Sequence, residues 1–300
     1  MGLLINGAWR DQWYDTKKSD GKFIRQDSKF RDYIGSYNFP AEPNRYHLYI
    51  SNACPWAHRT AIFRELKQLQ DIITISAVNA YMGENGWYFD HDPINNKKFL
   101  YEIYLLADPN YTGRVTVPIL WDKKTKTIVN NESAEIIRML NSAFNDISGN
   151  FDDYYPSELQ NEIDQINKLI YHKINNGVYK AGFATKQSVY ETEVHNLFNA
   201  LDDIEIRLTN QKFLLGDKLT EADIRLFTTL VRFDPVYVGH FKCNLKRIKD
   251  YPYLSRFIKT IIDIKDVAKT INYTEIKEHY YKSHPTINPN GIVPVGPIID

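Results

Sequence analysis

The sequence predicts two folded domains of different classes, a small α/β domain followed by an all-helical one. The first signal is a strand, turn, helix and strand pattern between residues 46 and 78, which is typical of a βαβ unit. The second is the helical spacing of apolar residues in the segments after residue 157. A chain of 300 residues is long enough for two cores of ordinary size.

The composition excludes several function classes. The chain carries 37 basic and 37 acidic side chains, so its formal net charge is zero, and no bulk field favours nucleic acid or an anionic membrane as a partner. A hydrophobic share of 43% excludes a wholly disordered protein. No stretch approaches the roughly 20 apolar residues that cross a bilayer, and the first residues lack a signal-peptide pattern. We therefore expect a cytosolic protein.

The α/β pattern begins after an N-terminal arm. Residues 1–44 are polar and have no sustained period, so we expect an extended arm. Residues 46–51 have the composition of a strand, and Pro55 opens a run with helical spacing that reaches Leu66. Residues 72–78 predict a second strand, which a right-handed crossover makes parallel to the first.

The second half of this domain follows a long insertion. Residues 79–113 are too many for a simple connection, so we expect a functional or partly disordered segment. Residues 117–121 and 127–130 flank a polar turn and predict a hairpin, followed by a helix that starts at Glu132. The α/β domain therefore spans residues 45–142.

The rest of the chain predicts a helical bundle. After a polar linker at residues 143–156, apolar residues recur at helical spacing. The predicted helices cover residues 157–175, 187–208, 221–233 and 251–263. The third is opened by Thr220-Glu221-Ala222-Asp223, a capping-box pattern. From about Thr270 the tail has no clear period, and we assign residues 157–300 to the helical domain.

Cys54 has the sequence context most typical of catalysis. It directly follows a predicted strand and precedes Pro55, the first residue of a predicted helix. The helix N-terminus, helped by His58 or Arg59 in the first turn, lowers a thiol pKa from about 8.5 and favours the thiolate. A buried, inert cysteine is the alternative, but this context is a poor one for it. We therefore predict that Cys54 is a nucleophile.

The motif around Cys54 contains a single thiol. Position 57 is alanine, so the second sulfur of a Cys-x-x-Cys dithiol is missing. Cys54 and Cys243 both stay thiols in a reducing compartment. A mixed disulfide on Cys54 must then be resolved by an external thiol. The motif therefore implies a small thiol cosubstrate.

Two further motifs have the groups that a peptide-like thiol needs. Pro118 begins a predicted strand, and a cis bond there would expose the N–H and C=O groups of Val117 for pairing with an extended peptide. Glu132 and Ser133 offer a carboxylate, a hydroxyl and backbone N–H groups at a helix start, which suits an α-amino-acid head group. An ordinary edge-strand proline and a plain helix cap are the alternatives.

No metal or nucleotide site is expected. Two pairs of residues have spacings seen in metal sites, His240 with Cys243 and His279 with His284. Neither pair has a third and fourth ligand arranged around it. The glycine-rich motifs of dinucleotide-binding and nucleotide-binding proteins are absent from the sequence.

Six short motifs occur in order along the chain. They are Ser51-Asn52-Ala53-Cys54-Pro55-Trp56-Ala57-His58-Arg59, Gly86-Trp87, Gly113-Arg114-Val115-Thr116-Val117-Pro118, Asn130-Asn131-Glu132-Ser133, Asn175-Asn176-Gly177-Val178-Tyr179 and His279-Tyr280-Tyr281. Together they resemble the glutathionyl-hydroquinone reductases, the Xi class of glutathione transferases. The resemblance runs from about Arg45 to Pro297, and the joint occurrence of six motifs is far more specific than any one of them.

The resemblance implies a thioredoxin-like N-terminal domain and a helical C-terminal domain, the glutathione transferase fold. It also implies that Cys54 attacks the sulfur of a glutathionyl-hydroquinone, expels the hydroquinone and forms a mixed disulfide that a second glutathione resolves. Glutathione would be held by Trp87, Arg114, Val117, Glu132 and Ser133. Tyr179 and Tyr280 would meet over Cys54 and line the quinone pocket, with Tyr281, Tyr237 and Trp56 as weaker candidates.

The resemblance further implies a homodimer built mainly from the helical domains. Two other functions stay open at this point. A conjugating or general thiol-transferring glutathione transferase is one, although a cysteine at position 54 would tend to form a mixed disulfide with glutathione and argues against conjugation. A non-catalytic binding protein with the same fold is the other, but such a protein would not need a poised thiol.

Overall fold

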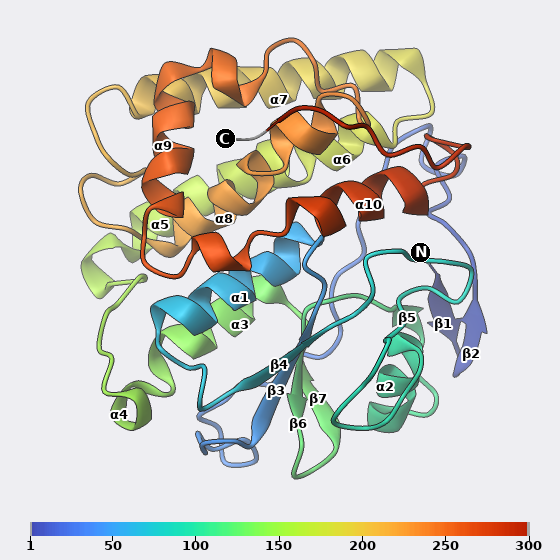
Figure 1. Cartoon of the computed structure of the whole chain (residues 1–300), viewed down its shortest axis with the longest axis vertical. Coiled ribbons are helices and arrows are strands. Elements are labelled where there is room, and N and C mark those ends of the chain that lie inside the picture. Colours follow the sequence, from blue (N-terminus) through green and yellow to red (C-terminus); the bar gives the residue numbers. More distant parts are fainter. Residues whose placement is uncertain (1, 299–300) are drawn as a thin grey trace. The chain divides into compact units, whose positions relative to one another are not determined.

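The computed structural model describes residues 2–298, and these form two compact units (Figure 1). The first unit contains the chain up to Trp13 and the segments Gln26–Asp152 and Thr270–Ser283. The second contains Tyr14–Arg25, Asp153–Lys269 and the chain from His284 onward. The division differs from the predicted domain boundaries in two places. Both units contain part of the N-terminal arm, and the first unit includes a segment of the C-terminal tail.

A four-stranded sheet lies at the centre of the first unit. Its order is β4-β3-β6-β7, formed by β3 (Tyr46–Ile50), β4 (Thr74–Ala77), β6 (Ile119–Asp122) and β7 (Thr127–Asn130). β3 and β4 are parallel, whereas β6 is antiparallel to both β3 and β7. The predicted βαβ unit and the predicted hairpin are therefore confirmed.

Helices complete the first unit (Figure 1). They are α1 (Pro55–Leu66), α2 (Leu100–Ala107), α3 (Ser133–Ser142), α4 (Asn145–Ser148) and α10 (Tyr273–Ser283). α1 and α3 pack against each other, and α1 starts at Pro55 because proline fits the first position of a helix. The tail from about Thr270 has no clear period in the sequence, yet it contains the helix α10, which the sequence analysis did not predict.

The N-terminal arm contains a hairpin that we did not predict. β1 (Leu3–Ile5) pairs with β2 (Ala8–Arg10), and β1 also pairs with β5 (Gly113–Arg114) to form a small antiparallel sheet. Asn6 and Gly7 connect the two strands, with φ values of 48° and 75°. Two positive φ angles are what a type I′ turn requires, and Asn-Gly is its preferred sequence. The expectation of an extended arm is therefore wrong for this part.

The insertion between β4 and β5 folds around one buried carboxylate. Asp92 is 2% exposed and accepts hydrogen bonds from the backbone N–H groups of Ile94, Asn95 and Lys97. The Tyr49 hydroxyl on β3 donates to the same carboxylate at 2.9 Å. The insertion is thereby tied to the central sheet.

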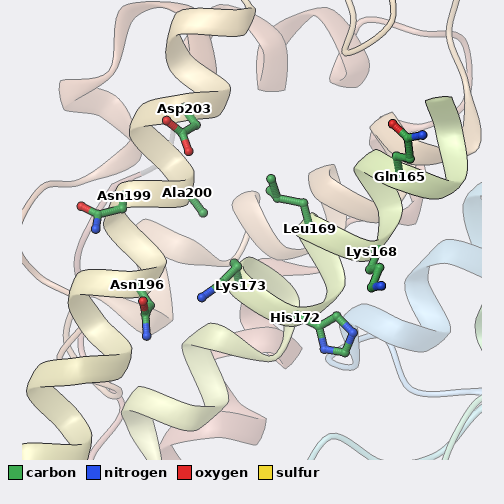
Figure 2. A pocket seen from close by; sticks show the side chains of 9 residues that line it. All are labelled: Gln165, Lys168, Leu169, His172, Lys173, Asn196, Asn199, Ala200 and Asp203. Carbon is green, nitrogen blue, oxygen red and sulfur yellow. The ribbon is translucent and has the colours of Figure 1, made fainter.

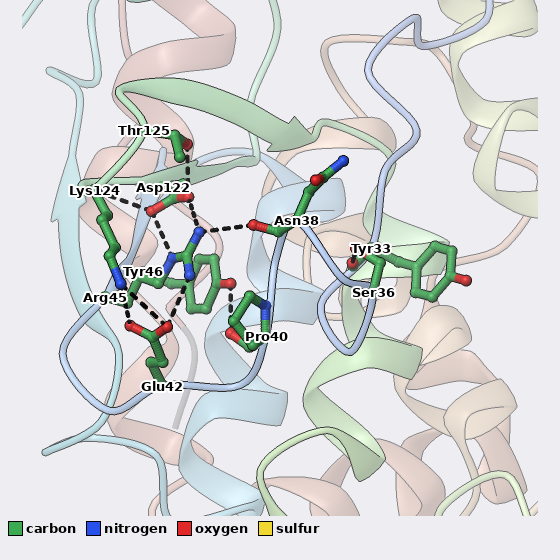
Figure 3. A network of polar contacts seen from close by, with 10 residues as sticks. All are labelled: Tyr33, Ser36, Asn38, Pro40, Glu42, Arg45, Tyr46, Asp122, Lys124 and Thr125. Atoms are coloured by element: carbon green, nitrogen blue, oxygen red, sulfur yellow. Dashed lines mark hydrogen bonds and ion pairs between the residues drawn. The ribbon is translucent and has the colours of Figure 1, made fainter.

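A buried ion pair joins the residue before β3 to the end of β6 (Figure 3). The Arg45 guanidinium donates to both carboxylate oxygens of Asp122, at 3.0 and 2.6 Å. The same guanidinium donates to the Asn38 carbonyl oxygen and to Glu42. Because these partners lie in the preceding loop, the network fastens that loop to the sheet.

The second unit is helical. Its elements, where η marks a 3-10 or π helix, are η1 (Ser157–Leu159), α5 (Gln160–Leu169), η2 (Ile170–Asn175), α6 (Gly177–Gly182), α7 (Gln187–Arg207), α8 (Glu221–Leu230), η3 (Phe233–Tyr237), η4 (Ile248–Asp250) and α9 (Pro252–Ile262). A last short helix, η5 (Ala268–Thr270), leads back to the first unit. The four predicted helices are present, and α6 was not predicted. The capping box is confirmed, because Asp223 accepts hydrogen bonds from the backbone N–H and hydroxyl of Thr220.

Candidate active site

Three loops of the first unit converge at one edge of the four-stranded sheet. β3 and β7 end at this edge and β6 begins there, because β6 is antiparallel to both neighbours. The loop after β3 carries Cys54, the residue before β6 is Pro118, and the residues after β7 lead to Glu132. The sheet therefore gathers three of the predicted motifs.

Cys54 lies beside the backbone of Val117. It is the N-cap residue of α1 and is half-buried, and its thiol donates to the Val117 carbonyl oxygen at an S···O distance of 3.7 Å. The bond between Val117 and Pro118 is cis. The predicted nucleophile and the predicted peptide-pairing edge are thus next to each other.

Glu132 and Ser133 lie at the start of α3. Glu132 is the N-cap, and its carboxylate accepts hydrogen bonds from the Ala134 N–H at 3.1 Å and the Ser28 hydroxyl at 3.2 Å. The Ser133 hydroxyl accepts a long hydrogen bond of 3.4 Å from the Arg59 guanidinium on α1. Glu132 is therefore a helix cap, which is compatible with a second role in binding an amino-acid head group.

Trp87 is held by the C-terminal helix α10. Its ring stacks on the His279 ring with 4.6 Å between centroids and 21° between planes. His279 Nδ1 lies 2.9 Å from the carbonyl oxygen of Ala80, so this nitrogen carries the proton. The Ser283 hydroxyl accepts a hydrogen bond from the Met82 N–H. α10 thus fixes the segment that carries Trp87.

Arg114 is oriented by the N-terminal arm. It lies on β5, which pairs with β1, and its guanidinium donates to the carbonyl oxygens of Gln12 and Trp13. Sequence reasoning gave the arm no part in the site. The arm in fact positions one of the predicted glutathione ligands.

The two predicted quinone-pocket tyrosines belong to different units. Tyr280 lies on α10 in the first unit and is 2% exposed. Tyr179 lies on α6 in the second unit and is 9% exposed. Their meeting over Cys54 stays a prediction, as do the roles of Tyr281 and Trp56, both half-buried.

Tyr179 is part of an aromatic cluster in the second unit. Its ring centroid lies 5.5 to 6.2 Å from those of Phe23, Phe183, Tyr237 and Phe241. The Arg25 guanidinium lies over the Tyr179 ring, 5.1 Å from its centroid. Sequence analysis missed Phe23 and Arg25 because the arm that carries them has no periodic pattern. Tyr237, a weaker candidate, is fully buried in this cluster.

Cys243 differs sharply from Cys54. Its side chain is fully buried, and burial raises the pKa of the Cys243 thiol. Its thiol donates to the carbonyl oxygens of Val178 and Phe241. Such a thiol stays protonated and is inert, so Cys54 is the better nucleophile.

The histidines with metal-like spacing are arranged differently from a metal centre. His240 Nε2 and His284 Nδ1 lie 3.0 Å apart, and burial lowers the pKa of His240 to about 4. His279 instead contacts Trp87 in the first unit. Within residues 2–298, no group of three or more His, Cys, Asp or Glu side chains could hold a metal ion.

The helical unit also has an open groove between α5 and α7 (Figure 2). Its volume is about 570 Å³, and it is lined by Gln165, Lys168, Leu169, His172, Lys173, Asn196, Asn199, Ala200 and Asp203. None of the residues predicted for catalysis or glutathione binding lines it.

Two family models match the chain. The glutathione S-transferase N-terminal domain matches residues 53–143, and the glutathione S-transferase C-terminal domain matches residues 187–260. Among the described residues, no helix is both long and apolar enough to span a membrane.

Known relatives resemble nearly the whole chain. Glutathionyl-hydroquinone reductase PcpF of Sphingobium chlorophenolicum is 58% identical over 99% of this chain and 96% of its own. Glutathionyl-hydroquinone reductase YqjG of Escherichia coli is 53% identical over 99% of this chain and 95% of its own. The glutathione-bound structure of YqjG superposes with a TM-score of 0.91 at 50% identity, over 99% of this chain and 96% of that one. A Xi-class glutathione transferase from Natrialba magadii gives a TM-score of 0.95 at 45% identity, over 100% and 95%.

Proposed function

Because the chain belongs to the glutathionyl-hydroquinone reductases, the Xi class of glutathione transferases, we propose that it reduces glutathionyl-hydroquinones through a mixed disulfide on Cys54. The observation that carries this proposal is the place of Cys54. Its half-buried thiol lies at the N-terminus of α1, 3.7 Å from the Val117 carbonyl oxygen at a cis Val117–Pro118 bond.

The reaction takes place in two steps. In the first, the Cys54 thiolate attacks the glutathione sulfur of the substrate, so that an S–S bond forms and the bond between sulfur and the aromatic carbon breaks. The electron pair of the broken bond stays with the ring carbon, which takes up a proton, and the hydroquinone leaves. In the second, the thiolate of another glutathione attacks the glutathione sulfur of the mixed disulfide and releases glutathione disulfide. Cys54 returns as a thiolate.

Glutathione is proposed to bind along the sheet edge of the first unit. The backbone of Val117 pairs with its extended peptide, as the position of the Val117 carbonyl beside the Cys54 thiol supports. The start of α3, with Glu132 and Ser133, receives the amino-acid head group. Trp87 and Arg114 complete the proposed set, and both are held rigidly by their neighbours.

The released hydroquinone needs stabilisation of its phenolic oxygens. Tyr179 and Tyr280 are proposed to donate hydrogen bonds to them as negative charge develops. A cytosolic location, where glutathione is kept reduced, would supply the second glutathione. The homodimer is proposed from family membership, and light scattering that gives the mass of one chain at every concentration would contradict it.

The test is a comparison of cysteine variants. Cys54→Ala should abolish the reduction of glutathionyl-hydroquinones and leave the fold intact, whereas Cys243→Ala, the matched control, should keep turnover. Intact mass after exposure to a glutathionyl-hydroquinone should show one glutathione adduct, lost in Cys54→Ala. Full turnover in Cys54→Ala would overturn the mechanism. Conjugation of aryl halides by the native protein, without a Cys54 adduct, would favour a conjugating transferase instead.

A further inference from the structure

A segment of the N-terminal arm, residues 14–25, belongs to the helical unit. Thr185 donates from its backbone N–H to the Gly21 carbonyl oxygen at 3.2 Å and hydrogen-bonds Thr16 through its hydroxyl. Lys186 forms an ion pair with Asp20. These contacts lie just before α7 and fix the course of the segment as it approaches α6.

The segment delivers a cation to the face of Tyr179. The Arg25 guanidinium carbon is 5.1 Å from the Tyr179 ring centroid and 5.5 Å from the Phe23 ring centroid. Arg25 Nε also donates to the Asn176 side-chain oxygen at 2.9 Å. Asn176 is buried and lies three residues before Tyr179 on the chain. Asn176 therefore helps to hold Arg25 over the Tyr179 ring.

The surroundings of the ring strengthen the effect of this charge. Phe23, Phe183, Tyr237 and Phe241 surround Tyr179 with apolar surface, and a cation acts more strongly where water is displaced. When the Tyr179 hydroxyl donates a hydrogen bond, negative charge builds up on the phenol oxygen and the ring. The Arg25 guanidinium at the ring face stabilises this negative charge. The hydroxyl thereby becomes a better hydrogen-bond donor.

We propose that Arg25 is a positioning residue for the reduction of glutathionyl-hydroquinones, acting through Tyr179. It fixes the ring and polarises the Tyr179 hydroxyl, which donates to the phenolic oxygen of the departing hydroquinone. This inference rests on the proposed role of Tyr179. It also gives the N-terminal arm a function, since the arm carries Arg25 to the face of Tyr179.

The test is a double-mutant cycle between Arg25→Met and Tyr179→Phe. Arg25→Met should lower kcat about fivefold with little change in KM, and Arg25→Lys, which keeps the charge but not the Asn176 hydrogen bond, should lose less. In the Tyr179→Phe background, Arg25→Met should change kcat less than twofold, because the hydroxyl it acts on is gone. Lys22→Met, an exposed cation of the same segment, is the control and should keep kcat.

Four experimental outcomes would either overturn the role of Arg25 or distinguish its failure from a failure of the proposed function. Native kcat in Arg25→Met overturns it. An equal fall of kcat in the native and Tyr179→Phe backgrounds also overturns it, because a merely structural role would act without the hydroxyl. A matched fall in Cys54 alkylation would place the effect on the thiol and overturn it too. Native turnover in Tyr179→Phe removes Tyr179 from the mechanism, and the inference with it, while adduct formation on Cys54 still tests the nucleophile separately.

Discussion

Replacing Asp122 with asparagine should destabilise the first unit by about 3 kcal/mol. Asp122 is fully buried, and the Arg45 side chain is 6% exposed. Burial by itself raises the pKa of Asp122, but hydrogen bonds from Arg45, Thr125 and the Lys124 N–H bring that pKa below its usual value, so the carboxylate is charged. Asparagine keeps the shape and leaves the guanidinium buried beside a neutral amide. Breaking a buried pair costs about 3–5 kcal/mol, and we expect the low end because Glu42 still contacts Arg45 at 3.0 Å.

Two further variants distinguish the stability effect of burying the ion pair from the effect of charge pairing alone. Glu42→Gln removes the other carboxylate that contacts Arg45. Because the Glu42 side chain is 38% exposed, this change should cost much less than Asp122→Asn. The double variant Arg45→Met and Asp122→Leu removes both charges of the buried pair, so it should cost less than Asp122→Asn. Its cost should also fall below the sum of the two single substitutions.

Urea unfolding of the full chain, with slopes compared between variants, measures these differences. An Asp122→Asn loss no larger than that of Glu42→Gln would refute the reasoning, because burial would then add nothing to the pair. A double variant as unstable as the sum of its parts would refute it as well.

The remaining predictions concern catalysis and pH. Tyr179→Phe or Tyr280→Phe should lower turnover about ten- to a hundredfold at unchanged Cys54 alkylation, since the lost hydrogen bond is worth about 1.5–3 kcal/mol; native turnover in both variants and their double would exclude the hydroxyls. Burial lowers the pKa of His47, which is 1% exposed, from 6.5 to about 4. The folded state therefore binds fewer protons than the unfolded state between these values, and stability is lost as the pH falls. Between pH 7.5 and 5 the native protein should lose about 2 kcal/mol more than His47→Gln; equal losses would contradict a neutral His47.

The central part of the fold was predictable because its signals are local. Two signals can be recognised within a few residues each. One is a strand followed by Cys54 and a proline-initiated helix, and the other is the proline directly before β6. Asn6 and Gly7 are an equally local signal for the β1–β2 hairpin, but the polar arm around them has no sustained period that marks its strands. The capping box at Thr220 was also read correctly, because its hydrogen bonds join residues three positions apart.

The helix α10 was missed for a physical reason. Its buried residues are Ile276, His279, Tyr280 and Ser283, which follow helical spacing, but three of the four carry polar groups. A pattern based on hydropathy therefore does not reveal the stripe. His279 and Ser283 are buried because they hydrogen-bond the insertion, and such partners, about 200 positions away in the chain, cannot be read from periodicity. The same holds for Arg25, whose position over Tyr179 depends on the path of the whole arm.

Because α10 lies near the end of the sequence, the first unit is completed only late in synthesis. The strands β3 to β7 and the helices α1 and α3 leave the ribosome long before Thr270–Ser283, the segment that completes their unit. Until then the Ala80 carbonyl and the Met82 N–H lack the partners that α10 brings, and Trp87 lacks the ring on which it stacks. The nascent N-terminal domain consequently lacks these contacts until synthesis is nearly complete, although domains generally fold as they emerge. Proteolytic cleavage after Lys269 would likewise impair the half of the protein that lies farthest from the cut in sequence.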